Sequence, residues 1–184
     1  MEVVTITDEM VQTATAYEQA VLATDTIKNT ENRSGHSAPR RYYIGSIGEQ
    51  AFAAYLDEAG IGYQYQPQAD GRSDEFDFVL SYGGNPYRID VKTTASAGAA
   101  YLSMPAYQAK KQTVDAFVGV VLREDEYAHV AQLRGIISRD NYAKNAKPVE
   151  KLGGSLGLPL WQLANIARIK DSCFDKAVRV TGSA

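Results

Sequence analysis

The chain has 184 residues, of which 45% are hydrophobic and 22% charged, and its formal net charge at pH 7 is −3. These values are ordinary for one compact soluble domain with a real core. They argue against a protein that coats nucleic acid through a globally basic surface, although a local basic surface and bound metals are compatible with handling phosphates. No run of about 18 apolar residues occurs, which excludes a helical membrane span.

Two features bear on the cellular compartment. The N-terminus, Met1–Thr5, lacks the basic start and apolar core of a secretory signal peptide. Cys173 is the only cysteine, so no intrachain disulfide is expected and a reducing compartment is indicated. We therefore expect a cytoplasmic protein.

The N-terminal part of the chain predicts a helix followed by a linker. Residues 6–30 have helical spacing, and the polar, turn-forming stretch 32–39 follows them. We therefore divide the chain into an N-terminal helix and linker (1–40) and a main domain with a C-terminal extension (41–184). Three arginines, Arg33, Arg40 and Arg41, flank the linker, which is either a solvated connector or a substrate-facing arm.

A second helix is predicted from Ser46 to Ala59. Its apolar stripe contains Phe52, Ala53 and Leu56, and Glu49 lies on the same stripe. An acidic side chain on the core side of a helix needs a partner, either a metal site or Lys92. The preceding Gly45–Gly48 lacks the Lys-Ser/Thr of a phosphate loop, so we read it as a helix start with Ser46 as the cap.

Three strands are expected next, at 62–66, 76–80 and in the segment that contains Asp90 and Lys92. Residues 67–73 form a loop between the first two, and Gly83–Pro86 predicts a turn that folds the last two into an antiparallel hairpin. Because residues two apart share a strand face, Asp90 and Lys92 project together. Asp77 lies on the strand face opposite Phe76, Phe78 and Leu80, and the hairpin brings it beside Asp90.

The remaining elements are predicted in outline. Ser103 is expected to cap a helix that begins at Met104 and carries Gln108, Lys110 and Lys111. The apolar run Ala116–Leu122 predicts a strand covered on both faces. The other predicted elements are a flexible or tightly turned stretch at 95–100, a strand at 126–137, a short helix after Ser138, a glycine-rich loop at 153–155 and an apolar segment at 158–161.

The paired carboxylates predict a metal site. Asp77 and Asp90 repel each other when close, unless a proton or a cation lies between them. Mg²⁺ prefers carboxylate oxygens and keeps several waters, so it is the natural occupant. His36 and His129 lack the spacing of zinc ligands, which argues against a zinc or other histidine-based metal site.

These four residues, in this order, resemble the PD-(D/E)xK nuclease superfamily, which includes restriction endonucleases, junction resolvases, phage exonucleases and repair nucleases. The resemblance covers about residues 44–122: an acidic residue on a first helix, an Asp on a second strand and Asp-x-Lys on a third. Phe76 stands where the eponymous proline would be, a position that varies within the superfamily.

The resemblance implies a fold and an activity. The fold is α/β, a restriction endonuclease-like core of helix, three strands, helix and strand, with a mixed central sheet flanked by helices. The activity is that of a Mg²⁺-dependent phosphodiester hydrolase. This nuclease is expected to act on DNA, with Mn²⁺ as a substitute metal. A homodimer, or a larger phage or mobile-element complex, is the expected assembly, with no membrane partner.

The resemblance also implies roles for individual residues. Asp77 and Asp90 hold the metal with the backbone carbonyl of Val91, and Glu49 binds through water or helps to hold a second metal. Lys92 orients the attacking water and stabilises the developing charge. Gln108, Lys110 and Lys111 are candidates for phosphate contacts.

Other interpretations of the same residues stay open. Asp90 and Lys92 are also compatible with an exposed cross-strand charge pair, Glu49 with a misassigned helix face, and Gln108, Lys110 and Lys111 with a merely solvated helix face. A non-catalytic nucleic-acid-binding or scaffolding module of a phage or mobile-element complex is the alternative function. The choices between endo- and exonuclease, and between DNA and RNA, are not made by the sequence.

Overall fold

The computed structural model describes residues 1–23, 38–66, 76–82, 85–95, 98–110, 113–125 and 128–170. Several predictions fall outside these ranges: the linker at 32–39 for most of its length, the loop at 67–73, Gly83 and Gly84, Lys111, His36 and Cys173. Among the helices that are described, none is both long and apolar enough to cross a membrane.

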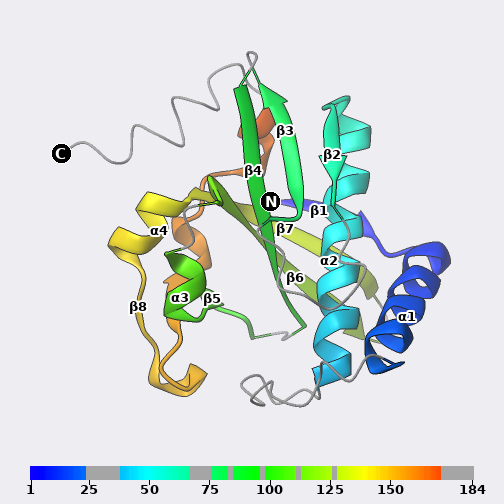
Figure 1. Cartoon of the computed structure of the whole chain (residues 1–184), viewed down its shortest axis with the longest axis horizontal. Helices are drawn as coiled ribbons and strands as arrows, with labels where there is room; N and C mark the ends of the chain where they lie inside the picture. The colour runs from blue at the N-terminus through cyan, green and yellow to red at the C-terminus, as the bar shows by residue number, and fades with distance from the viewer. Residues whose placement is uncertain are drawn as a thin grey trace.

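A mixed six-stranded sheet forms the centre of the α/β fold (Figure 1). Its strand order is β1-β7-β6-β4-β3-β2, and only the β4–β6 pair is parallel. The strands are β1 (Glu2–Thr5), β2 (Tyr63–Tyr65), β3 (Phe78–Tyr82), β4 (Asn85–Thr94), β6 (Ala116–Asp125) and β7 (Ala128–Ser138).

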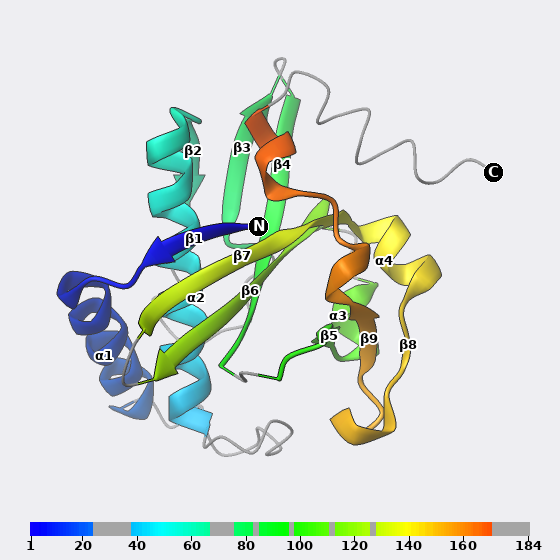
Figure 2. The same cartoon turned by 180° about the vertical axis from the view of Figure 1, so that it is seen from behind.

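Two helices cover one face of this sheet. The long helix α2 (Ala38–Ala59) runs across the strands, and α1 (Asp8–Ala23) lies along it (Figures 1 and 2). The core between helix and sheet includes Phe52, Leu56, Phe78 and Ile89, all fully buried.

The opposite face is covered by a second, three-stranded sheet and short helices (Figure 2). This smaller sheet has the order β5-β9-β8, from β5 (Tyr101–Met104), β9 (Leu156–Pro159) and β8 (Lys147–Pro148). The accompanying helices are α3 (Ala106–Ala109), α4 (Arg139–Asn145) and the 3₁₀ turns η2 (Glu150–Leu152), η3 (Leu160–Gln162) and η4 (Ile166–Lys170). A second core forms here around Phe117, Tyr142 and Leu158.

Strand β6 separates the two cores. Ala116, Val118, Val120 and Leu122 face α2, whereas Phe117 and Val121 face the second core. This confirms the prediction that the run Ala116–Leu122 is a strand covered on both faces. The strand predicted at 126–137 is confirmed as β7, apart from its first two residues, which lie outside the described ranges.

The start of α2 differs from the prediction. The helix begins at Ala38, eight residues before Ser46, so Gly45–Gly48 lies inside it and Ser46 is not its cap. Tyr43, Ile44 and Ile47 are buried on the core side of the helix. Tertiary packing of this stripe outweighs the low helix propensity of the two glycines. The boundary that the sequence places between residues 40 and 41 falls within this helix.

The helix predicted from Met104 is wrong. Tyr101–Met104 is a strand, and only the four residues Ala106–Ala109 are helical. Pro105 occupies the cap position without a side-chain hydrogen bond, and Ser103 lies within the strand. Leu102 and Met104 are buried while Tyr101 is exposed, so the stretch has the alternation of a strand rather than a helical stripe.

The other boundaries move by a few residues. The first helix begins at Asp8 rather than 6, after the unpredicted strand β1, and residues 24–30 lie outside the described ranges. Asn85 and Pro86, predicted in a turn, already belong to β4, because Asn85 pairs with Tyr82. The strand predicted at 76–80 is shifted to Phe78–Tyr82, with Asp77 immediately before it.

Candidate functional site

The candidate site lies where β4 continues past the beginning of β3. Strand β3 pairs with β4 through Asn85–Ile89, whereas β6 pairs with it through Ile89–Thr94. Beyond Ile89, β4 therefore has no β3 residue of the ladder at its side. Asp90, Val91 and Lys92 follow at this point.

Asp77 fills the position that β3 leaves. Its backbone N–H donates to the carbonyl of Ile89 at 2.9 Å. Its side-chain Oδ2 accepts a hydrogen bond from the N–H of Val91 at 2.6 Å. Continuing the β3–β4 register by one residue sets Asp77 opposite Asp90. The expected juxtaposition of the two carboxylates across the hairpin is present.

Both carboxylates are buried, and Lys92 lies against one of them. Asp77 and Asp90 are 6% and 5% exposed. The Nζ of Lys92 is 2.8 Å from each oxygen of Asp90, and the contact with Oδ1 is a hydrogen bond. Within the described residues, the buried Oδ2 has this ionic contact but no well-aligned hydrogen-bond donor. Asp90 and Lys92 are thus a mostly buried pair rather than an exposed one.

The carboxyl group of Asp77 is held in an unfavourable environment for charge. Burial raises its pKa well above the usual range, and the negative charges of Asp90 and Glu49 raise it further. Lys92 and the Val91 N–H act in the opposite direction without cancelling the effect. A buried anionic cluster of this kind is typical of functional sites.

Lys92 remains a cation. Burial disfavours its ammonium group, but the attraction of Asp90, Asp77 and Glu49 outweighs burial and raises the pKa of Lys92. The side chain of Lys92 is 22% exposed, so it contacts the buried carboxylate of Asp90 and also reaches the surface.

Glu49 approaches the same cluster from α2. It is half-buried, and its Oε2 accepts a hydrogen bond from the hydroxyl of Tyr65 at 2.8 Å. Its charge is close enough to influence both Asp77 and Lys92. Phe52 and Leu56 on the same stripe are fully buried, in agreement with the predicted helix face.

Close packing fixes α2 against β4 at the neighbouring residue. A Cβ atom on Gly48 would overlap the Oγ1 of Thr93 and lie 2.8 Å from its Cβ. Thr93 therefore points towards α2, on the strand face opposite Asp90 and Lys92, as expected. The absent side chain of Gly48 lets the helix approach and brings Glu49 near the strand.

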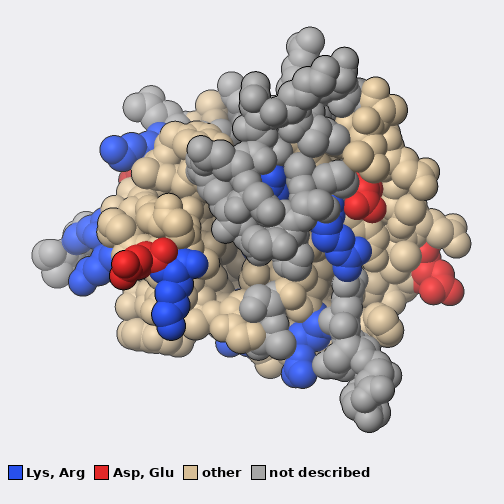
Figure 3. Space-filling model, turned by 90° about the horizontal axis from the view of Figure 1, so that it is seen from below, with Lys and Arg blue, Asp and Glu red and all other residues tan. Residues whose placement is uncertain are grey.

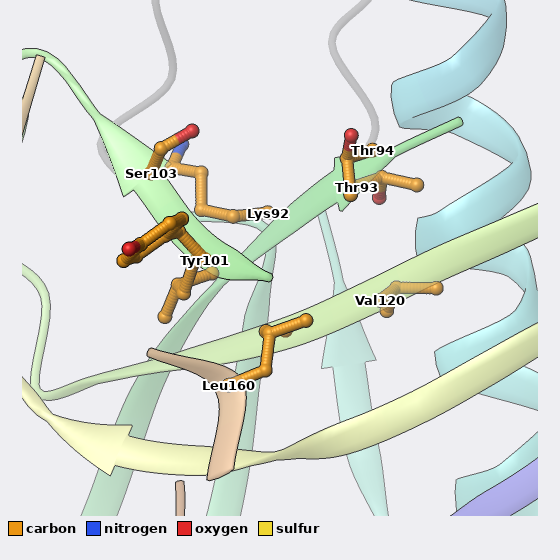
Figure 4. Close-up of a pocket in the computed structure, with 9 residues that line it drawn as sticks. Lys92, Thr93, Thr94, Tyr101, Ser103, Val120 and Leu160 are labelled. Atoms are coloured by element: carbon orange, nitrogen blue, oxygen red, sulfur yellow. The ribbon is translucent and has the colours of Figure 1, made fainter. Parts of the chain in front are cut away.

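A small pocket opens beside Lys92 (Figure 4). It encloses about 30 Å³, enough for a water-sized group. The lining comes from β4, β5, β6 and η3 and includes Lys92, Thr94, Tyr101, Ser103, Gly119 and Leu160. Neither Gln108 nor Lys110, both described on or after α3, lines this pocket, and Lys111 lies outside the described ranges.

Sequence reasoning missed Tyr65, Thr94, Tyr101 and Ser103. Thr94 had a signal, because it is two residues after Lys92 and shares its strand face. The alternation of Tyr101–Met104 is also a signal for a strand, but Ser103 followed by Pro105 predicts a helix start at the same place. Nothing in the sequence links Tyr65 to Glu49, 16 residues away, before the pairing of β2 with β3 is known.

The donor set suits a hard divalent cation, although the described residues do not gather three ligands. The available donors are carboxylate oxygens, and Asp90 Oδ2 is a buried acceptor without a well-aligned hydrogen bond. No group of three or more His, Cys, Asp or Glu side chains in the described ranges is arranged to hold an ion. Glu49 is turned to Tyr65, and Asp77 to the backbone of Val91.

Comparison of the chain with protein-family models and with curated proteins finds no match.

Proposed function

We propose that the chain is a metal-dependent nuclease of PD-(D/E)xK type that hydrolyses phosphodiester bonds in DNA. The observation that carries the proposal is the meeting of Asp77, Asp90 and Lys92 at the beginning of β3, with Glu49 approaching from α2. Three carboxylates and one ammonium group from three separate segments, α2, the start of β3 and β4, share one electrostatic environment there. An ion pair with only a surface role would lie on a solvent-exposed strand and would not be buried in this way.

The arrangement of elements supports a restriction endonuclease-like core. Helix α2, strands β2, β3 and β4, the short helix α3 and strand β6 follow in the order that the resemblance implies, with β5 of the smaller sheet inserted between β4 and α3. The mixed sheet, with β4 parallel to β6, is consistent with that core.

Asp77 and Asp90 would hold the metal, with the Val91 carbonyl and Glu49 completing its surroundings. Once bound, a divalent ion supplies Lewis-acid polarisation of the phosphate and a lowered pKa for its water. Its positive charge also relieves the repulsion that now raises the pKa of Asp77.

Lys92 acts as an electrostatic stabiliser rather than as a general base. Because its pKa is raised, it stays protonated at neutral pH and has no lone pair to accept a proton. Its ammonium group orients the attacking water and stabilises the negative charge that develops on the phosphate oxygens. A water oxygen forms the new bond to phosphorus and gives up a proton to solvent water, the bond to the leaving oxygen breaks, and solvent water returns a proton to that oxygen.

Positive side chains are available for DNA despite the net charge of −3. On the face seen in Figure 3, lysine and arginine side chains are spread over the surface, and acidic side chains lie against some of them. Arg40 and Arg41 lie in the first turn of α2, about 13 Å along the helix from Glu49. They are candidates for phosphate contacts in addition to Gln108 and Lys110.

The test is a cleavage assay on linear, circular, single-stranded and branched DNA with Mg²⁺, with Mn²⁺ and with EDTA. Metal-dependent cleavage by the wild type that is lost in Asp90→Ala supports the proposal. Equal activity of the two proteins, or activity in EDTA, overturns it.

A non-catalytic DNA-binding or scaffolding module is the second candidate. One observation favours it: Glu49 and Asp77 spend carboxylate oxygens on Tyr65 and Val91, and no three-ligand group forms within the described residues. This candidate predicts DNA binding that is unchanged by Mg²⁺, without turnover on any of the four substrates.

A further inference from the structure

Tyr65 donates a hydrogen bond that links Glu49 on α2 to the sheet beside Asp77. It lies on β2, and its hydroxyl donates to Glu49 Oε2 at 2.8 Å. Glu49 is half-buried and has a long side chain, so a fixed position costs it rotamer entropy. A rigid donor beside it lowers that cost at the moment a ligand binds.

The ring of Tyr65 is itself fixed. It stacks on Phe78, with ring centroids 4.8 Å apart and planes 23° apart. Phe78 is fully buried and directly follows Asp77 in the chain. The next residue of β2's segment, Gln66, donates its N–H to the carbonyl of Asp77 at 2.9 Å. Tyr65 therefore joins Glu49 to the backbone that carries Asp77.

We propose that Tyr65 is a positioning residue that holds Glu49 for the divalent metal beside Asp77 and Asp90. This inference rests on the proposed function, because it assigns a task to a residue of that same site. Groups that hydrogen-bond a metal ligand fix its orientation, and their loss costs about 10- to 100-fold in metal affinity or activity.

Tyr63 provides a matched control on the same strand. Its hydroxyl also donates to a carboxylate of α2, Asp57 Oδ2 at 3.2 Å, and its ring also contacts Phe78, at 5.6 Å. Asp57, however, is exposed and lies eight residues after Glu49. Replacing either tyrosine with phenylalanine removes one hydroxyl and one hydrogen bond to α2, but only Tyr65 contacts the site.

The experiment is calorimetric titration of Mg²⁺ into wild type, Tyr65→Phe, Tyr63→Phe, Glu49→Gln and the Tyr65→Phe/Glu49→Gln double variant. Circular dichroism first establishes that all five proteins are folded. We expect the Kd for Mg²⁺ to rise about 10-fold in Tyr65→Phe and to stay at the wild-type value in Tyr63→Phe. In the Glu49→Gln background the tyrosine substitution should add little, because its target has already been changed.

An unchanged Kd in Tyr65→Phe overturns the inference. Equal losses in the two tyrosine variants overturn it as well, since they would reflect a general loosening of β2. So does a full 10-fold loss that persists in the Glu49→Gln background, and so does a wild type that binds no Mg²⁺.

The nuclease proposal fails separately. Wild-type protein that binds Mg²⁺ but cuts none of the four DNA substrates overturns the proposed activity, while the calorimetric comparison still decides the role of Tyr65.

Discussion

At the scale of single residues, the site depends on a side chain that takes the place of a backbone group of strand β3. Asp77 satisfies the N–H of Val91 with its carboxylate, where a continued β3 would have supplied a carbonyl. The carboxyl group of Asp77 thereby enters the sheet opposite Asp90, and the carboxylate of Asp90 remains in contact with Lys92. The functional and structural roles of Asp77 are therefore inseparable.

Lys92→Ala is expected to reduce the cleavage rate at saturating DNA and Mg²⁺ by about 100-fold or more, because an electrostatic stabiliser of the reacting phosphate is lost. DNA affinity should change little. Single-turnover kinetics and a binding titration measure the two quantities separately. Lys144→Ala, an exposed lysine on α4, controls for the loss of one positive charge. A variant of Lys92 that loses only DNA affinity would show that it is a phosphate contact instead.

Asp77→Asn is expected to stabilise the metal-free protein at neutral pH. A carboxyl group whose folded pKa is raised contributes stability that is fully present below its unfolded pKa and is lost as the pH rises through the folded value. Asparagine keeps an oxygen for the Val91 N–H but has no charge to bury. Urea unfolding in EDTA at pH 5 and pH 7.5 measures the effect: the fall in unfolding free energy with pH should be smaller in the variant. Parallel pH dependence in the two proteins would contradict the assignment.

The placement of Asp77, Asp90 and Lys92 relative to one another was predictable from the sequence, because each signal is local. Alternation along a strand pairs Asp90 with Lys92, and a glycine-rich turn brings Asp77 opposite. Tyr65 was not predictable, because its contact with Glu49 depends on the pairing of β2 with β3 and on the angle at which α2 crosses them.

At the scale of elements, a glycine, Gly48, lets α2 approach the sheet closely. The sequence placed the helix start at residues 45–48, since two glycines and a serine resemble a helix boundary. The buried Ile44 and Ile47 show why the helix continues through them. The error at β5 has a related cause: Ser-x-Pro is a good helix start, but the burial of Leu102 and Met104 favours a strand.

Gly45→Ala and Gly48→Ala are expected to have opposite effects on stability. A methyl group on Gly45 meets only Glu49 Oε1 at 3.9 Å, so the variant should gain about 0.5–1 kcal/mol from helix propensity. The same change at Gly48 overlaps Thr93 and should cost about 1–3 kcal/mol. Thermal or urea unfolding of the two variants measures the difference. Stabilisation by Gly48→Ala would show that α2 does not approach β4 as closely as described.

At the scale of the whole molecule, the anionic cluster links ligand binding to folding. Buried carboxylates that repel one another destabilise the metal-free fold, and an ion that binds only the folded state stabilises it by mass action. Under the proposed function the net charge of −3 strengthens this link, because a DNA phosphate approaching the site would meet fewer negative charges once a cation is bound.

Mg²⁺ at about 100 times its Kd is therefore expected to raise the unfolding free energy by about 2.7 kcal/mol. Differential scanning calorimetry should show a higher Tm in the wild type and no shift in Asp90→Ala. NaCl at the same ionic strength controls for general screening. An equal shift in both proteins would place the bound ion elsewhere.

The position of β6 between the two cores has a consequence for how the molecule comes apart. Phe117 and Val118 are consecutive residues, yet one belongs to the core of the smaller sheet and the other to the core under α2. Each core therefore includes side chains of β6, and neither core is enclosed without this strand. Loss of either layer exposes half of the same strand, so the two cores should melt together as one cooperative unit. Hydrogen exchange along β6 should accordingly give similar opening free energies for amides next to either core.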